Sequence, residues 1–257
     1  MRRLSRIFKS DGKTVVVAMD HGMGLSVNPA LDNTGEVLKA IVRGGADAVL
    51  TSYGIARRYH KELEGVGLIL RTDGGGSMLG KGSENNRMLF SVEDALRLGA
   101  DSVACMGFPG APYEYDSINN LAHLAAEGHA WGMPVMVEAL PGGFAPEPAN
   151  TVDNVRLAVR YSCEAGADII KTTYTGSEDE FKTVAAASFR PVIVLGGEKV
   201  KDMRSLFDCL ESAIRAGAAG VAIGRNVWKH PEPEKVVRAL VDLVHNGKSA
   251  AALVSGL

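Results

Sequence analysis

The feature of this sequence that most constrains its fold is a repeated alternation between short apolar runs and longer stretches of helical periodicity. Eight such runs occur, at residues 14–19, 48–50, 67–70, 102–106, 135–137, 168–171, 192–195 and 220–223. Most of them are apolar throughout, as strands are when both faces of a parallel sheet are covered. A turn signal follows each run, and a stretch with helical spacing comes next. The sequence therefore predicts eight strand-then-helix units.

Four of the helical stretches end in the same way. They span residues 33–44, 91–98, 151–164 and 205–215, and the Gly-Ala pairs that follow them begin at Gly45, Gly99, Gly166 and Gly217. A glycine just past a helix end readily adopts the positive φ that stops the helix. We therefore expect each of these helices to stop at its glycine and lead tightly into the next strand.

The length of the chain suits one closed ring of these units. A (β/α)8 barrel takes about 250 residues, and this chain has 257, of which 46% are hydrophobic. No break in composition divides it, so we expect a single (β/α)8 TIM barrel, of the α/β class, as one domain over residues 1–257. A doubly wound open sheet is the alternative, although it does not ordinarily need eight units.

Charge and composition argue against several classes of partner and location. The net charge is -2, which gives no electrostatic reason to expect nucleic acid or an anionic membrane surface. The N-terminal residues lack the apolar region of a signal peptide, and no apolar run approaches the length of a membrane span. Cys105, Cys163 and Cys209 show no CxxC spacing and are expected to be buried, reduced thiols. We therefore expect a soluble, cytoplasmic protein.

Polar residues gather where the predicted strands end, which in a barrel is the face that holds the active site. They are Asp20 and His21 after the first strand, Arg71 and Asp73 after the third, Glu138 after the fifth and Lys171 at the end of the sixth. Longer connections at residues 73–87 and 139–150 follow the third and fifth strands, and so lie at the same face. These side chains are expected to build a pocket.

Lys171 is the candidate nucleophile of this pocket. It closes an apolar strand, where loss of hydration favours the neutral amine that attacks carbonyl groups. Two other interpretations stay open, an exposed lysine at a strand end and an ion-pair partner of Asp20 or Glu138. Lys199 is a rival amine, but it lies further into a loop.

Two glycine-containing loops predict a phosphate site. Gly196 and Gly197 follow the seventh strand, and Gly224 and Arg225 follow the eighth. Barrel enzymes often bind phosphate at these two positions, where backbone N–H groups and an arginine can surround the anion. The alternative is that the glycines only serve tight turns.

No metal or cofactor is expected from the sequence. The six histidines include no HxH or HxxxH pair, so a zinc site would need ligands from distant loops. Four of them lie in helical or polar stretches and are interpreted as non-catalytic: His60, His123, His129 and His245. Trp131 and Trp228 are interpreted as packing residues.

Four segments resemble one known family. Residues 17–22, 169–176, 196–199 and 220–228 are similar to motifs of the class I fructose-bisphosphate aldolases of the archaeal type and of their barrel relatives, the autoinducer-2 processing thiolase and the aminodeoxyheptulosonate synthase. These segments run from the first strand to the eighth, so the resemblance covers essentially the whole chain. It also implies a large ring-based homo-oligomer such as a decamer.

The resemblance assigns roles to individual residues. It implies that Lys171 forms the Schiff base, that Asp20 is an active-site carboxylate, and that Gly197, Gly224 and Arg225 bind the substrate phosphate. In the thiolase branch the histidine that matches His21 is important, which keeps His21 among the catalytic candidates.

One position departs from the family pattern. The aldolases and the heptulosonate synthase place a tyrosine that acts as general acid/base before the proline of the fifth-strand loop, and Leu140 stands there in this chain. Either another group moves the proton, with Glu138, Asp20, His21 or an inward-pointing Tyr174 as the candidates, or the reaction is not the ordinary aldol cleavage. For Asp20 or Glu138 this role would require a carboxyl pKa raised toward neutrality.

These observations predict a class I aldolase, a lyase that makes or breaks a C–C bond in a phosphorylated ketose, with dihydroxyacetone phosphate as one fragment. Lys171, Asp20, Glu138 and His21 are its catalytic candidates. Two alternatives use the same scaffold: thiolase-like acyl transfer from a phosphorylated dione, which the missing tyrosine favours, and a sugar-phosphate-binding barrel without catalysis.

Overall fold

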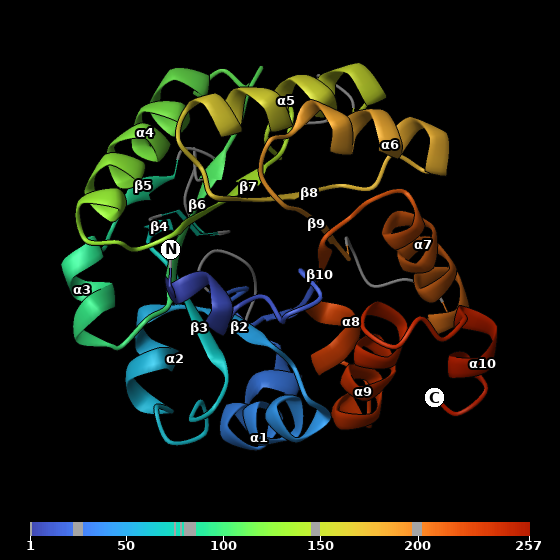
Figure 1. Cartoon of the computed structure of the whole chain (residues 1–257). Helices are drawn as coiled ribbons and strands as arrows, with labels where there is room; N and C mark the ends of the chain where they lie inside the picture. Colours follow the sequence, from blue (N-terminus) through green and yellow to red (C-terminus); the bar gives the residue numbers. More distant parts are fainter. Residues whose placement is uncertain are drawn as a thin grey trace.

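Eight parallel strands close into a barrel in this protein (Figure 1). The structure is a computed structural model that describes residues 2–22, 28–74, 76–77, 79, 86–144, 150–196 and 202–257. In their order around the barrel, the strands are β1 (Thr14–Ala18), β10 (Gly220–Ile223), β9 (Val192–Leu195), β8 (Ile169–Thr172), β7 (Val135–Ala139), β6 (Ser102–Gly107), β3 (Gly67–Arg71) and β2 (Ala48–Thr51). All eight predicted strands are confirmed, and the open-sheet alternative is wrong because β1 pairs with β10.

Helices surround the barrel (Figure 1). They are α1 (Thr34–Gly44), α2 (Tyr53–Arg58), α3 (Val92–Arg97), α4 (Glu114–Ala130), α5 (Val152–Glu164), α6 (Glu178–Ala187), α7 (Met203–Arg215), α8 (Arg225–Trp228), α9 (Pro233–Val244) and α10 (Ala250–Val254), with short 3-10 helices at Arg2–Arg6 and Pro29–Leu31. The helix ends expected at glycines are confirmed: Gly45 adopts φ +92° after α1, and Gly217 adopts φ +103° after α7. None of the helices in the described part of the chain is long and apolar enough to cross a membrane.

The strands are apolar throughout because both of their faces are buried. Side chains of one parity point into the barrel, where Val16, Ala18, Leu50, Ile69, Ala104, Met136, Ile169, Ile193 and Ala222 form one cluster. Side chains of the other parity pack against the helices in a larger cluster. Ile7, which follows the N-terminal 3-10 helix, is fully buried in the inner cluster and closes the barrel at its N-terminal end. The interior is a packed core up to the level of the active site.

Three aspartates, two of them buried and Asp101 partly buried, join neighbouring strands at the N-terminal end of the barrel. Asp47, Asp101 and Asp168 each stand just before a strand, after the Gly-Ala pair of a helix end. Each accepts a hydrogen bond from a backbone N–H of the neighbouring barrel strand, at Val15 of β1, Leu68 of β3 and Val135 of β7, with donor–acceptor distances of 2.7 to 3.0 Å. The recurring Asp was visible in the sequence without a role. Its position ties adjacent strands in register and satisfies N–H groups that would otherwise be unpaired.

Two expectations for local regions need adjustment. The connection expected at residues 73–87 begins and ends in a short antiparallel ladder, in which β4 (Asp73–Gly74) pairs with β5 (Arg87–Met88). Cys105 and Cys163 are buried free thiols as expected, but Cys209 is only partly buried.

The aspartate contacts predict a stability loss in Asp168→Ala. Asp168 accepts from the Val135 N–H at 3.0 Å and from His129 Nε2 at 3.0 Å, and its removal leaves a buried N–H without a partner. We expect the free energy of unfolding to fall by about 1–3 kcal/mol, measured by urea denaturation. The matched variant Asp208→Ala removes a half-exposed helical aspartate that pairs with Arg204 and should change stability by less than about 0.5 kcal/mol. Equal losses in the two variants would contradict the role assigned to Asp168.

Candidate active site

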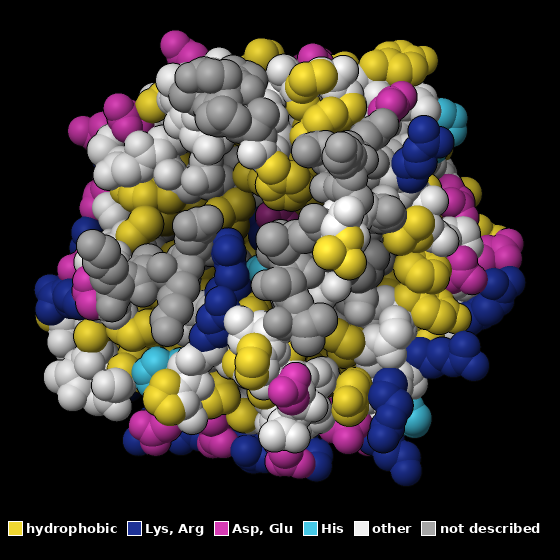
Figure 2. All heavy atoms as spheres, turned by 180° about the vertical axis from the view of Figure 1, so that it is seen from behind, with side chains coloured by type: hydrophobic (Ala, Val, Ile, Leu, Met, Phe, Trp, Pro, Cys, Tyr) yellow, Lys and Arg dark blue, Asp and Glu magenta, His cyan; other side chains and the backbone are white. Residues whose placement is uncertain are grey.

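The polar residues of the site lie one layer above the apolar interior of the barrel. Side chains alternate between the two faces of a strand. A residue two positions after one that points into the barrel therefore points into the barrel as well. Asp20, Arg71, Met106, Glu138 and Lys171 each follow an interior residue by two positions, after Ala18, Ile69, Ala104, Met136 and Ile169. Strand register places Met106 beside Glu138 and Glu138 beside Lys171. The sequence pattern thus brings these side chains together at the C-terminal face, where Figure 2 shows a hollow near the middle of the molecule.

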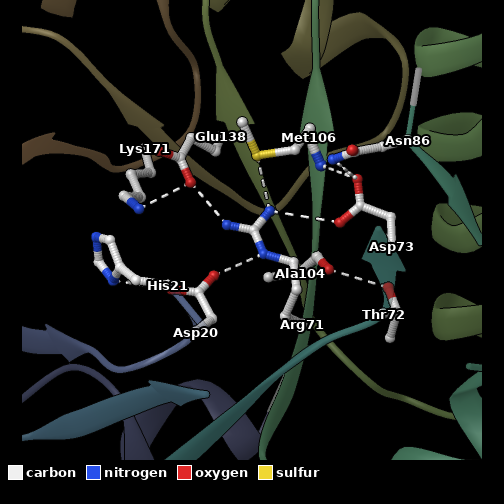
Figure 3. Close-up of polar contacts among 10 residues, drawn as sticks. All are labelled: Asp20, His21, Arg71, Thr72, Asp73, Asn86, Ala104, Met106, Glu138 and Lys171. Atoms are coloured by element: carbon white, nitrogen blue, oxygen red, sulfur yellow. Dashed lines mark hydrogen bonds and ion pairs between the residues drawn. The ribbon is translucent and has the colours of Figure 1, made fainter. Parts of the chain in front are cut away.

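The guanidinium of Arg71 is the centre of this layer (Figure 3). Its Nε donates to Asp20 Oδ2 at 2.8 Å, and its Nη2 donates to Glu138 Oε2 at 2.7 Å. Its Nη1 lies 3.5 Å from Asp73 Oδ1 and 2.9 Å from Met106 Sδ. Arg71 is only 6% exposed, and the three carboxylates raise its pKa further although burial alone would lower it. One buried cation therefore holds three acidic side chains.

Lys171 reaches the same layer from β8. It is 5% exposed, and its Nζ donates to Glu138 Oε2 at 2.8 Å. The interpretation as an exposed lysine is therefore wrong, and the ion pair with Glu138 is present. Glu138 Oε2 thus bridges the candidate nucleophile and Arg71.

The carboxyl groups of Asp20 and Glu138 differ from expectation. Burial raises the pKa of Asp20, but the charges of Arg71, Lys171 and His21 outweigh it and lower the value from 3.8 to about 2. Burial also raises the pKa of Glu138, and Lys171 and Arg71 bring it below its ordinary value. The expectation of a pKa raised toward neutrality is wrong for both residues. The two cations Arg71 and Lys171 face both carboxyl groups and lower both pKa values.

Asp73 is the carboxyl group in this layer whose pKa is raised. Burial is the main cause, and it outweighs the charge of Arg71 and the hydrogen bonds that the carboxylate accepts. Those bonds come from the Met106 N–H at 2.8 Å and Asn86 Nδ2 at 3.2 Å. Asp73 and Arg71 stand at the end of a predicted strand, but the residue pattern indicates no individual role for either. Their position at a barrel strand end was the signal that could have included them.

His21 stands beside Asp20 at the edge of the charged layer. Its Nδ1 is 3.8 Å from Asp20 Oδ1 and has no hydrogen-bond partner among the described residues. Its ring meets the edge of Trp228 with centroids 5.5 Å apart. Burial lowers the pKa of His21, and the opposing charge of Asp20 does not restore it. The imidazole is therefore neutral at neutral pH.

The residues expected to bind phosphate lie at the ends of β9 and β10. Gly196 and Gly224 have a packing reason for being glycine: a Cβ at Gly196 would lie 2.9 Å from Ile223 Cδ1, and one at Gly224 would collide with the His21 ring. Asn226 Nδ2 donates to the Gly196 carbonyl at 3.2 Å and links the two loops. Arg225 begins α8 at this edge and is partly buried. Gly197 and the rival amine Lys199 lie outside the described residues.

Tyr174 is excluded as a substitute for the missing tyrosine. Tyr174 does not point into the site, because its hydroxyl donates to Ser212 Oγ on α7 at 2.9 Å and its ring packs on Phe181 of α6. Leu140 lies two residues beyond Glu138 and packs against the buried cluster of Met106, Phe108 and Ala111. The place of the tyrosine is therefore part of an apolar surface.

Other polar groups lie away from the layer. His129 and His245 bond to Asp168 and Asp47 at the N-terminal end of the barrel, so the interpretation of both as non-catalytic agrees with their positions. Within the part of the chain that the structure describes, no three His, Cys, Asp or Glu side chains are grouped as metal ligands would be. Trp228 is a packing residue that borders the site, since its Nε1 donates to the Ala18 carbonyl at 3.1 Å.

Comparison with known proteins adds to this geometry. The family model described as "DeoC/LacD family aldolase" matches residues 14–230. The 2-amino-3,7-dideoxy-D-threo-hept-6-ulosonate synthase of Halobacterium salinarum is 36% identical over 253 residues, 98% of this chain and 94% of that protein. The class 1 fructose-bisphosphate aldolase of Thermoproteus tenax is 33% identical over 252 residues, 96% of this chain and 95% of that protein.

Solved structures agree with the sequence relatives. An archaeal fructose 1,6-bisphosphate aldolase superimposes with a TM-score of 0.87 and 32% identity, covering 96% of this chain and 99% of that one. A further archaeal aldolase, solved with its catalytic lysine covalently bound to the carbinolamine intermediate of the substrate, has a TM-score of 0.86 and 31% identity over 95% of this chain and 98% of that one. With its barrel, its buried lysine and these matches, the chain belongs to the DeoC/LacD family of aldolases.

Proposed function

We propose that this chain is a class I aldolase in which Lys171 forms a Schiff base with a phosphorylated ketone such as dihydroxyacetone phosphate. The observation that carries the proposal is the hydrogen bond of 2.8 Å between Lys171 Nζ and Glu138 Oε2 in a buried layer. A lysine that attacks a carbonyl must first give up a proton, and here the Glu138 carboxylate is hydrogen-bonded to the lysine nitrogen and can accept it. The relatives named as aldolases and as a synthase support the same reaction class.

Glu138 carries protons through the reaction in this proposal. It takes the ammonium proton of Lys171, the neutral amine adds to the ketone, and the proton returns to the departing hydroxyl as water, leaving a protonated imine. Glu138 then removes a proton from the adjacent carbon to give the enamine. When Lys171 loses its charge to Glu138, the attraction that lowers the pKa of Glu138 disappears with it. The group can therefore serve as acid once the cycle has begun.

The C–C bond forms between this enamine carbon and the carbonyl carbon of an aldehyde. The aldehyde oxygen takes the proton held by Glu138 and becomes a hydroxyl group, and water hydrolyses the regenerated imine to release the product and Lys171. Cleavage is the reverse. Arg71 keeps Asp20 and Glu138 in place during these steps, so no reorganisation of charged groups is needed.

The substrate phosphate binds at the ends of β9 and β10 in this proposal. Arg225 supplies the cation, and backbone N–H groups at the start of α8 and in the Gly196 and Gly224 loops complete the anion site. With the phosphate bound there, the carbonyl carbon of the substrate lies next to Lys171, which is on the adjacent strand β8. Binding energy from the phosphate positions the reacting carbon.

Borohydride trapping tests the Schiff base. Incubation with dihydroxyacetone phosphate and sodium borohydride should add the mass of one reduced adduct, and peptide mapping should place it on Lys171. Lys171→Met should lose the adduct and turnover together. Lys182→Met, which removes an exposed lysine on α6, should keep both. Turnover without an adduct, or an adduct on another lysine such as Lys199, would contradict the proposal.

The role of Glu138 predicts the behaviour of Glu138→Gln. The amide keeps the shape of the side chain but cannot accept the Lys171 proton, so we expect kcat to fall about 10²- to 10⁴-fold while KM changes little. Stopped-flow trapping should show that imine formation itself is slowed. A variant with full kcat would show that another group moves the proton, with His21 the first candidate.

The charge cluster makes stability depend on pH. The pKa of Asp20 falls from 3.8 to about 2 in the folded protein, so its carboxylate stabilises the fold above pH 3.8 and this contribution is lost as the pH falls toward 2. We expect the stability difference between the natural protein and Asp20→Asn to shrink by about 2 kcal/mol between pH 5 and pH 2, measured by urea titration. A difference that stays constant over this range would rule out the coupling of Asp20 to Arg71.

One observation favours acyl transfer as a second candidate function. A neutral His21, whose Nδ1 has no hydrogen-bond partner among the described residues, lies beside Asp20. Leu140 stands where the related aldolases have the tyrosine that donates the proton in the aldol reaction. Transfer of an acetyl group from a phosphorylated dione to a thiol, lost in His21→Ala, would support it. Aldol turnover retained in that variant would favour the aldolase.

A further inference from the structure

An apolar surface lies beside Glu138 and Met106, in the loops that follow β6 and β7. It consists of Tyr113, Leu140 and Phe144 with the buried Phe108 behind them, and we call these four residues the apolar wall. Phe108 is fully buried, and the rings of Tyr113 and Phe144 meet it edge-on with centroids 5.4 and 5.3 Å away. Phe144 remains 64% exposed although it lies in this cluster. Tyr113 and Leu140 are partly buried, so the accessible part of this surface is an exposed ring backed by a packed apolar cluster, which suits contact with an apolar ligand.

The apolar wall is continuous with the reacting groups. Met106 and Glu138 are paired in the register of β6 and β7, and Phe108 and Leu140 each lie two residues further along the same faces of these strands. Met106 packs in one cluster with Phe108, and its Sδ lies 2.9 Å from Arg71 Nη1. A substrate chain that extends beyond Glu138 therefore meets the wall next.

The two loops are held together by their backbones. The Leu140 N–H donates to the Gly107 carbonyl at 2.9 Å, and the Gly142 N–H donates to the Pro109 carbonyl at 2.7 Å. A surface fixed in this way can discriminate between ligands by shape, because it does not yield to a poor fit. Figure 2 shows hydrophobic side chains bordering the central hollow.

The charge of the wall differs from that of the candidate phosphate site. Residues 107–113 and 139–155 contain no Lys, Arg or His. Arg225 stands on the other side of Lys171, since β8 lies between β7 and β9 in the barrel. A phosphate placed against the wall would lose hydration without gaining a cation from these two loops, which is unfavourable. An uncharged carbon chain would lose only unfavourable contact with water.

We propose that the aldehyde partner of this enzyme is uncharged and apolar, an aliphatic or aryl-alkyl aldehyde whose chain packs on Tyr113, Leu140 and Phe144, with the buried Phe108 supporting them from behind. This inference rests on the proposed aldolase function and names its second substrate class. The enamine on Lys171 attacks the aldehyde carbon, a C–C bond forms, and the aldehyde oxygen takes the proton from Glu138. The product carries one phosphate at one end and an apolar chain at the other.

The test measures aldol addition to dihydroxyacetone phosphate with a panel of aldehydes. The panel holds propanal, butanal, pentanal, phenylacetaldehyde and glyceraldehyde 3-phosphate. Each added methylene should raise kcat/KM by about fourfold from propanal to pentanal. Pentanal and phenylacetaldehyde should exceed glyceraldehyde 3-phosphate by at least about tenfold. A preference for glyceraldehyde 3-phosphate, or no dependence on chain length, would overturn the proposal.

Variants locate the effect on the wall. Leu140→Ala and Phe144→Ala should flatten the chain-length dependence, and Phe144→Lys should raise kcat/KM for glyceraldehyde 3-phosphate relative to pentanal. Phe189→Ala is the matched control, because Phe189 is 57% exposed in the connection between α6 and β9 at the other end of the barrel. It should leave the aldehyde preference unchanged. A change in Phe189→Ala equal to that in Phe144→Ala would contradict the assignment.

Failure of this inference can be told apart from failure of the aldolase proposal. Borohydride trapping with dihydroxyacetone phosphate alone involves no aldehyde. An adduct on Lys171 together with preference for the phosphorylated aldehyde would keep the aldolase and reject the wall as the aldehyde site. Absence of the adduct during turnover would reject the Schiff base itself.

Discussion

The buried guanidinium of Arg71 is the interaction on which the arrangement of the active site depends. It lies above a fully apolar barrel interior, where an isolated carboxylate would be strongly unfavourable. Because it binds Asp20, Asp73 and Glu138 together, three acids can share a layer that also holds Lys171. The same contacts fix the orientation of Glu138, so that its carboxylate is hydrogen-bonded to the Lys171 nitrogen. Removing only this cation would leave several carboxylates close together without compensation.

Most of the fold follows from the sequence because the same unit is repeated. Both faces of every barrel strand are buried, so each strand is a short apolar run, and glycine ends the helices that need a positive φ at that point. The position of Lys171 followed from the same pattern, because it closes one of these runs. The Asp residues that tie β1 to β2 and β7 to β8 were visible as a repeat, but their partners are backbone groups of another strand. A single sequence does not reveal such pairings.

The electrostatics of the site could not be predicted from the same signals. The protonation of Asp20 and Glu138 depends on which side chains face them, and Arg71 is separated from Glu138 by 67 residues. Burial and charge compete for each carboxyl group, and charge outweighs burial for Asp20 whereas burial outweighs charge for Asp73. The glycines at Gly196 and Gly224 also show a packing role that a motif alone does not separate from phosphate binding. The residue types at the strand ends predicted where the active site lies. The protonation state of each side chain depends on contacts that only the structure shows.

The central claim is that Lys171 and Glu138 act as one unit on a ketone held by its phosphate. A crystal structure of the protein soaked with dihydroxyacetone phosphate tests it most directly. The account predicts continuous density from Lys171 Nζ to the carbonyl carbon, the phosphate beside Arg225 and the Gly196 and Gly224 loops, and a Glu138 oxygen within hydrogen-bond distance of the new bond. A ligand bound without a covalent link, with its phosphate elsewhere and Lys171 still paired as it is now, would contradict it.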